Sequence, residues 1–151
     1  MRRKVWTILL STLALLGGYV VVAAPASAAV GCWGDYCSGR DPMSTGCAND
    51  AITTATANFS TGSVQVRWSP TCKTNWTRLV VYPTGRSCMN YGSLWAVQDT
   101  GYRQSTEVPF VCNTYSTTTY WTPMIYSPVH RVRGEFYNLD RSYDSVITAW
   151  S

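Results

Sequence analysis

The chain has 151 residues, 46% of them hydrophobic and 13% charged, with 12 Lys and Arg residues against 8 Asp and Glu. This length suits one domain with its own core and is too short for two. Three of the basic residues, Arg2, Arg3 and Lys4, stand at the very start of the chain. The remaining nine basic residues barely exceed the eight acidic ones. Phosphate-driven nucleic-acid binding is therefore excluded, since it needs a clustered basic surface.

The first residues have the three parts of a secretory signal. After the basic start comes an uncharged apolar run from Val5 to Ala24, and then the small residues Ala26 and Ala28. This pattern predicts a signal peptide over residues 1–28 and a single domain over residues 29–151. The apolar run is long enough to stay in a membrane as an anchor. The cleavage site directly behind it favours removal, so we expect membrane contact only during export.

A second processing pattern overlaps the first. Ala29-Val30-Gly31-Cys32 resembles a lipobox, in which the cysteine becomes lipidated. Its first position is Ala where Leu is usual, and lipidation of Cys32 would leave Cys37 without a partner. We therefore predict a secreted, extracellular protein, with a lipid anchor through Cys32 as the alternative.

Six cysteines lie in the predicted domain, and an even number in a short exported chain predicts three disulfides. A metal site is disfavoured because zinc ligands usually come as paired, closely spaced cysteines or with histidines. Here there is one C-x₄-C unit and one histidine. Of the possible pairings, the sequence favours Cys32–Cys37, Cys47–Cys72 and Cys88–Cys112 without excluding the others.

The elements that follow are mostly β. Residues 45–57 contain both Ala and Thr and fit either a short helix or a strand. Val64, Val66 and Trp68 alternate with polar residues, which predicts a half-buried strand whose partner is Trp76–Tyr82. Further short β segments are predicted at 93–98, 107–111, 120–126, 130–137 and 145–150. The expected fold is all-β, a small antiparallel sandwich or barrel stapled by disulfides, with at most one short helix.

Four motifs in the first half of the domain occur together: C-x-G-x-x-C-x-G-x-D-P, T-G-C-A-x-D-A, R-W-S-x-x-C and W-x-R-L, over residues 32–79. With Thr122-Pro123-Met124, they resemble a family of small exported actinobacterial domains of unknown function. In that pattern the second position of the third motif is Tyr and the last of the fourth is Ile. The resemblance implies the fold of that family and export of the domain. Because the family has no assigned activity, it implies no catalytic residue.

The polar residues in these motifs have structural interpretations. Asp41 before Pro42 is typical of an Asx turn. Asp50 fits either a cap on a short helix or a partner for Arg67 or Arg78, and these arginines could also stack on Trp68 and Trp76. We expect these residues to be structural.

The inventory for catalysis is small. His130 is the only histidine, so any Ser-His-Asp or Cys-His mechanism must use it. No G-x-S-x-G elbow is present, and only two Glu, Glu107 and Glu135, accompany six Asp. We therefore predict no catalytic residues, no cofactor and no metal.

Aromatic residues are abundant: after removal of the signal, six Trp and nine Tyr remain. The densest group, Tyr115, Tyr120, Trp121 and Tyr126, is the candidate binding surface, because such rings stack on sugars or anchor proteins. The alternative interpretation is that they are ordinary strand residues, half buried against a neighbour.

The sequence therefore predicts a secreted, non-catalytic domain that binds an extracellular protein or glycan, at the cell surface or beyond it. One alternative is a secreted protease inhibitor with Tyr82–Arg86 as bait, since disulfide-rigid domains are preorganised for binding. The other is a small extracellular hydrolase.

Overall fold

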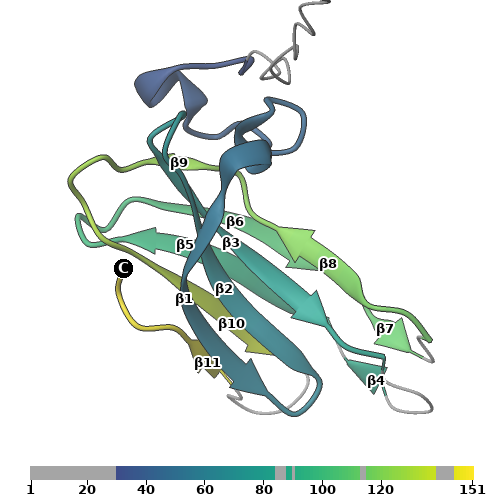
Figure 1. The fold of residues 1–151 in the computed structure, drawn as a ribbon. Coiled ribbons are helices and arrows are strands. Elements are labelled where there is room, and N and C mark those ends of the chain that lie inside the picture. The colour runs from purple at the N-terminus through teal and green to yellow at the C-terminus, as the bar shows by residue number, and fades with distance from the viewer. Residues whose placement is uncertain (1–29, 84–87, 90, 113–114, 139–144) are drawn as a thin grey trace, which may run out of the picture.

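The computed structural model describes residues 30–83, 88–89, 91–112, 115–138 and 145–151. They form two antiparallel sheets packed face to face, a short ribbon, and a block of turns at one end (Figure 1). The all-β prediction is confirmed, and the architecture is a sandwich, because no sheet in these ranges closes into a barrel. The predicted signal peptide lies outside the described residues.

The first sheet is built from the first three strands and two later ones. Its order is β1-β2-β3-β8, with β9 also beside β3. The bounds are Ile52–Phe59 for β1, Gly62–Ser69 for β2, Thr74–Val81 for β3, Thr118–Trp121 for β8 and Ile125–Tyr126 for β9. The predicted pairing of the strand at Val64–Trp68 with the one at Trp76–Tyr82 is confirmed by the pairing of β2 with β3.

The second sheet has the order β11-β10-β5-β6. Its strands are β5 (Gly92–Gln98), β6 (Arg103–Val108), β10 (Val132–Asn138) and β11 (Ser145–Ile147). The chain therefore crosses from β9 in the first sheet to β10 in the second through residues 127–131, which we name the crossover segment.

The ribbon pairs β4 (Cys88–Met89) with β7 (Val111–Cys112). The single strand predicted at 107–111 is wrong in this respect: β6 ends at Val108 and β7 begins at Val111. Pro109 stands between them and has no N–H to donate to a ladder, which explains the interruption.

Helical structure in the described ranges is limited to two 3₁₀ turns, η1 (Gly34–Cys37) and η2 (Cys47–Asp50), where at most one short helix was predicted. Gly46 precedes η2 with a φ of 78°, a left-handed conformation that glycine adopts at little cost. The ambiguous stretch 45–57 thus divides into η2 and then β1, since its Thr-rich half favours a strand. No helix within these ranges is long and apolar enough to cross a membrane.

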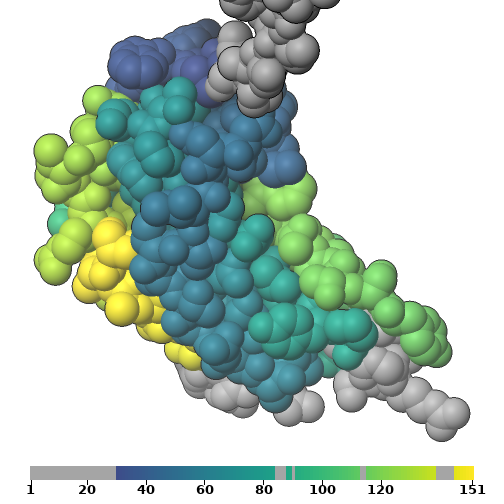
Figure 2. Space-filling view, in the orientation of Figure 1, coloured from purple at the N-terminus to yellow at the C-terminus, as the bar shows by residue number. Residues whose placement is uncertain are grey.

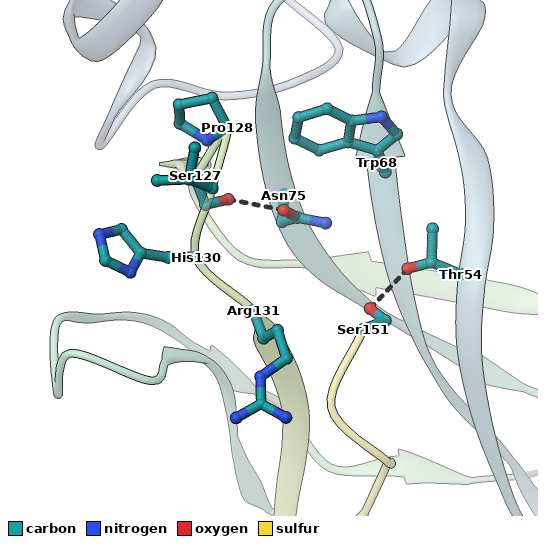
Figure 3. Close-up of a pocket in the computed structure, with 9 residues that line it drawn as sticks. Thr54, Trp68, Asn75, Ser127, Pro128, His130, Arg131 and Ser151 are labelled. Atoms are coloured by element: carbon teal, nitrogen blue, oxygen red, sulfur yellow. Dashed lines mark hydrogen bonds between the residues drawn. The ribbon is translucent and has the colours of Figure 1, made fainter.

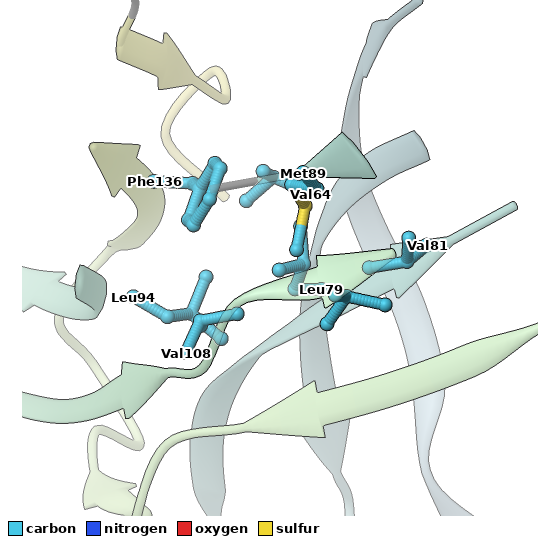
Figure 4. Packing of buried hydrophobic residues seen from close by; sticks show 8 residues of the cluster. Val64, Leu79, Val81, Met89, Leu94, Val108 and Phe136 are labelled. Carbon is cyan, nitrogen blue, oxygen red and sulfur yellow. The ribbon is translucent and has the colours of Figure 1, made fainter. Parts of the chain in front are cut away.

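Alternation along the strands places the core between the sheets. Leu79 and Val81 on β3 face Leu94 and Phe136 of the second sheet, and all four are at most 2% exposed (Figure 4). Met89 of the ribbon belongs to the same cluster. Burial of these side chains supplies the main favourable term in folding.

The two sheets pack tightly against each other at Gly134 of β10. A β-carbon there would lie 2.8 Å from Cγ2 of Thr77 and 3.0 Å from Cγ1 of Val64, both in the opposite sheet. Thr77 also donates its hydroxyl to the carbonyl of Trp95 at 2.8 Å, a hydrogen bond between the sheets. A residue without a side chain is therefore needed at position 134.

The three disulfides are those that the sequence favoured: Cys32–Cys37, Cys47–Cys72 and Cys88–Cys112. The first two hold residues 30–51, which we name the N-terminal block, and attach it to the turn between β2 and β3. The third joins the strands of the ribbon. The block lies at one end of the molecule (Figure 2) and packs against Trp76 and Met124.

Candidate functional site

A hollow of ≈ 320 Å³ lies where the crossover segment passes over the edge of β1, β2 and β3 (Figure 3). It is lined by an aromatic ring, several neutral hydrogen-bonding groups and two basic side chains. The lining residues are Thr54, Trp68, Asn75, Ser127, Pro128, Val129, His130, Arg131 and Ser151.

Trp68 is in the hollow because of strand alternation. Val64 and Val66 on β2 point into the core and are fully buried, and Trp68 is the next residue on the same face. There the second sheet no longer covers β2, so the indole is only half buried and extends toward Pro128 (Figure 3). This leaves part of an aromatic ring available to a ligand.

The neutral polar groups of the hollow are held in fixed positions by one another. Asn75 donates its amide to the carbonyl of Arg67 at 3.1 Å and accepts the hydroxyl proton of Ser127 at 2.6 Å. The hydroxyls of Thr54 and Ser151 are 2.7 Å apart. Ser151 is further held by two backbone hydrogen bonds to Val132. The hollow is therefore preorganised, which limits the entropy lost on binding.

Charged groups occupy one edge of the hollow. Asp99 accepts the backbone N–H of Arg131 at 3.2 Å, and its carboxylate lies 3.1 Å from Nδ1 of His130 and 3.6 Å from Nε of Arg131. The Arg131 backbone N–H, aided by the charges of His130 and Arg131, outweighs desolvation and holds the pKa of Asp99 below its usual value. The anionic form of Asp99 thus positions both basic side chains.

The hydroxyl of Ser127 is buried and bonded to groups other than His130. It is 3% exposed and donates to Asn75 and, at 3.3 Å, to the carbonyl of Ile125. The imidazole of His130 points outward from the hollow (Figure 3) and contacts Asp99. A nucleophile needs a hydrogen bond to its base, and these contacts join Ser127 to Asn75 instead.

The four aromatic residues predicted as a binding surface are placed in different surroundings. Tyr120 packs against the main core and Trp121, its neighbour on β8, against the N-terminal block. Tyr126 is half buried on β9, and Tyr115 is 85% exposed. Alternation along β8 separates the first two, so the structure does not bring the four rings to one face. The predicted bait loop Tyr82–Arg86 falls largely outside the described residues.

The Asx turn predicted at Asp41 is confirmed. Its carboxylate accepts the backbone N–H groups of Met43 and Ser44, each at 2.8 Å, and the indole N–H of Trp121 at 2.7 Å. Burial alone would raise the pKa of Asp41, but these hydrogen bonds, led by that of Trp121, outweigh it and lower the pKa. Asp41 thereby ties the N-terminal block to β8.

Pairing with Arg67 or Arg78, one of the two roles predicted for Asp50, is wrong. Its carboxylate accepts the hydroxyl of Ser69 at 2.6 Å and the backbone N–H of Thr71 at 2.8 Å, at the turn that holds Cys72. Arg67 donates to Thr53 at 2.6 Å and Arg78 to Gln65 at 3.0 Å. Each arginine bonds a neutral side chain directly across its strand pair, so neither one reaches Asp50.

A polar network on the outer face of the second sheet was not foreseen from the sequence. Glu135 is 6% exposed and accepts from Arg133 and from the hydroxyl of Tyr137, both at 2.6 Å. The hydrogen bond to the Glu135 carboxylate raises the pKa of Tyr137. Their spacing of two along β10 puts all three on one face, which was the available signal. These hydrogen bonds hold the three side chains together on this face of β10.

Fold and site define a small disulfide-bonded β-sandwich with a tryptophan-lined hollow at the crossover between its sheets. The family model described as Protein of unknown function (DUF2690) matches residues 35–133, and the chain belongs to this family. The resemblance to a domain family of unknown function is thereby confirmed. The match includes every lining residue of the hollow except Ser151. No curated protein and no solved structure matches the chain.

Proposed function

We propose that this protein is a secreted, non-catalytic binding domain that takes a saccharide unit of an extracellular glycan in the hollow beside Trp68. The observation that carries the proposal is the half-buried indole surrounded by fixed neutral hydrogen-bonding groups. A sugar ring offers an apolar C–H face and a rim of hydroxyls, and the hollow offers a matching aromatic face and polar rim.

The charge of the hollow supports a neutral ligand. The carboxylate of Asp99 offsets the positive charge of Arg131 and contacts the His130 ring, and the remaining polar groups are an amide and hydroxyls. A neutral, hydroxyl-rich ligand can exchange hydrogen bonds with these groups without desolvating an unpaired charge. A ring stacked on Trp68 would lie beside the hydroxyls of Thr54 and Ser151, which line the same hollow and are not buried.

Three disulfides fit folding in an oxidising environment, and the basic, apolar and small-residue segments of residues 1–28 support export with cleavage after Ala28. The resemblance to exported actinobacterial domains supports the same location. The disulfide between Cys32 and Cys37 supports release over lipid anchoring, since a lipidated cysteine has no thiol left to pair.

Binding is tested by retention of the mature protein on purified cell walls and immobilised polysaccharides, with affinities from titration of tryptophan fluorescence. Trp68→Ala should weaken binding about 10- to 100-fold, because truncating a central aromatic anchor costs about 2 kcal/mol or more. Trp33→Ala is the matched control, since Trp33 is 67% exposed and does not line the hollow. Equal affinities of the two variants, or retention on none of the glycans, would refute the proposal.

The non-catalytic part has its own test. A glycan that is retained should keep its mass after prolonged incubation with the protein, because Ser127 donates to Asn75 and no nucleophile–base pair is formed with His130. Release of shorter fragments by the wild type, abolished in His130→Ala, would instead establish the hydrolase.

A further inference from the structure

Four cysteine side chains from separate parts of the chain meet beneath the N-terminal block. The Sγ atoms of Cys32, Cys37, Cys47 and Cys72 all lie within 4.8 Å of one another. They form two neighbouring disulfides, and the Sγ atoms of Cys32 and Cys47, which belong to different disulfides, are 3.6 Å apart. We name this group the four-cysteine cluster.

The spacing suits a tetrahedral metal site. With Zn–S bonds of about 2.3 Å, four sulfurs around one zinc ion lie about 3.8 Å from each other. The 3.6 Å between Cys32 and Cys47 is close to that edge, and no pair in the cluster exceeds 4.8 Å. Opening the two S–S bonds therefore requires the sulfurs to move apart by only an ångström or two, estimated from the same bond length.

The surroundings of the cluster also suit a structural metal. All four cysteines are at most 6% exposed and pack with Trp76 and Met124. The segment that follows Cys37 is also held by hydrogen bonds that do not depend on the disulfides, because Gly39 donates to the carbonyl of Met124 at 2.9 Å and Met124 donates to that of Arg40 at 2.9 Å. A dry site on a fixed backbone keeps its ligands together after the covalent links are broken.

We propose that the four-cysteine cluster binds one thiophilic divalent cation, such as Zn²⁺, when its disulfides are reduced. A dithiol reductant supplies two electrons and two protons to each disulfide and is itself oxidised to a disulfide. The four thiols then lose their protons as Zn²⁺ takes four thiolates. The N-terminal block would thus be held either by two disulfides in the oxidised protein or by one metal ion in the reduced protein.

The test compares two double variants that each keep four cysteines. Cys88→Ser/Cys112→Ser removes the distant ribbon disulfide and retains the cluster, whereas Cys32→Ser/Cys37→Ser removes half of the cluster. Both are reduced with an excess of a dithiol, which is then removed anaerobically, and titrated with Co²⁺. Tetrahedral cobalt thiolate is recognised by its strong visible and near-ultraviolet bands, and competition with Zn²⁺ gives the zinc affinity.

We expect the first variant to bind one Co²⁺ with four-thiolate bands and the second to bind at least about 100-fold more weakly, since loss of even an outer-shell partner costs about 10- to 100-fold. Equal affinities would mean that the cysteines bind as an unfolded chain and would overturn the proposal. So would the absence of four-thiolate bands in the first variant. Glycan retention is measured separately on the oxidised protein, so failure of either proposal leaves the other standing.

Discussion

Gly134→Ala tests whether the sheets are as close at this position as the structure has them. The added methyl group would lie 2.8 Å from Cγ2 of Thr77, 3.0 Å from its Oγ1 and 3.0 Å from Cγ1 of Val64. These distances are too short for carbon atoms, so either the threonine or the β10 backbone must shift. A shift of Thr77 also removes its hydrogen bond to the carbonyl of Trp95.

The magnitude follows from three terms. Overpacking a core costs about 1–3 kcal/mol, and loss of the Thr77 hydrogen bond costs about 1 kcal/mol. Replacing glycine by alanine stabilises the fold by about 0.4–1 kcal/mol, because it lowers the conformational entropy of the unfolded chain. Gly134→Ala should therefore lower the free energy of unfolding by about 2 kcal/mol.

Urea denaturation of the oxidised protein measures this loss, which corresponds to a midpoint about 1 M lower at an ordinary slope. Gly31→Ala is the control, because its nearest atom, Cα of Thr45, would be 3.5 Å away. Thr77→Ser in the Gly134→Ala background removes the Cγ2 contact, keeps the hydroxyl, and should restore part of the stability. A Gly134→Ala protein within about 0.5 kcal/mol of wild type, the range of ordinary surface substitutions, would refute the reasoning.

Three further predictions concern the ribbon disulfide and the attachment of the N-terminal block. Cys88→Ser/Cys112→Ser opens a link across a separation of 24 residues and should lower the free energy of unfolding by about 3.5 kcal/mol in urea; a loss under about 1 kcal/mol would contradict it. Trp121→Phe removes the hydrogen bond to Asp41 and should cost about 1.5 kcal/mol, with a double-mutant cycle against Asp41→Asn giving a coupling energy above zero. Because the pKa of Asp41 is lowered in the fold, its contribution is present above about pH 4 and is lost as the pH falls through the folded pKa. Asp41→Asn should accordingly show a shallower decline of the urea midpoint from about pH 5 to pH 2 than wild type, and an equal decline would count against this assignment.

The features that the sequence predicted correctly are local or depend on strict periodicity. Val64, Val66 and Trp68 mark β2 because alternation over a few residues suffices to define a half-buried strand. The Asx turn at Asp41 needs only its two following residues. Cys47–Cys72 was favoured because Cys72 directly follows the first clear strand, so the link needed no knowledge of the second sheet.

Neither the hollow nor the four-cysteine cluster could be predicted from the sequence, because both depend on how distant segments pack together. Trp68 could be assigned to a core-facing position, but whether it is covered depends on how far the second sheet extends over β2. Likewise, Cys37 and Cys47 become neighbours only because η1 and η2 fold back on the sheet. The aromatic surface predicted near Tyr120 ignored alternation, which sends that ring and the ring of Trp121 to different clusters.

The crossover segment has a practical consequence for finding the ligand. Residues 127–131 line the hollow while connecting the two sheets, so a bound molecule would favour the state in which the sheets are together and would raise the melting temperature by mass action. A ligand at 100 times its Kd adds about 2.7 kcal/mol, which for a domain of this size corresponds to a rise of about 10 °C. A thermal-shift screen of a glycan library would thus detect the natural ligand with unlabelled protein, before any activity is known.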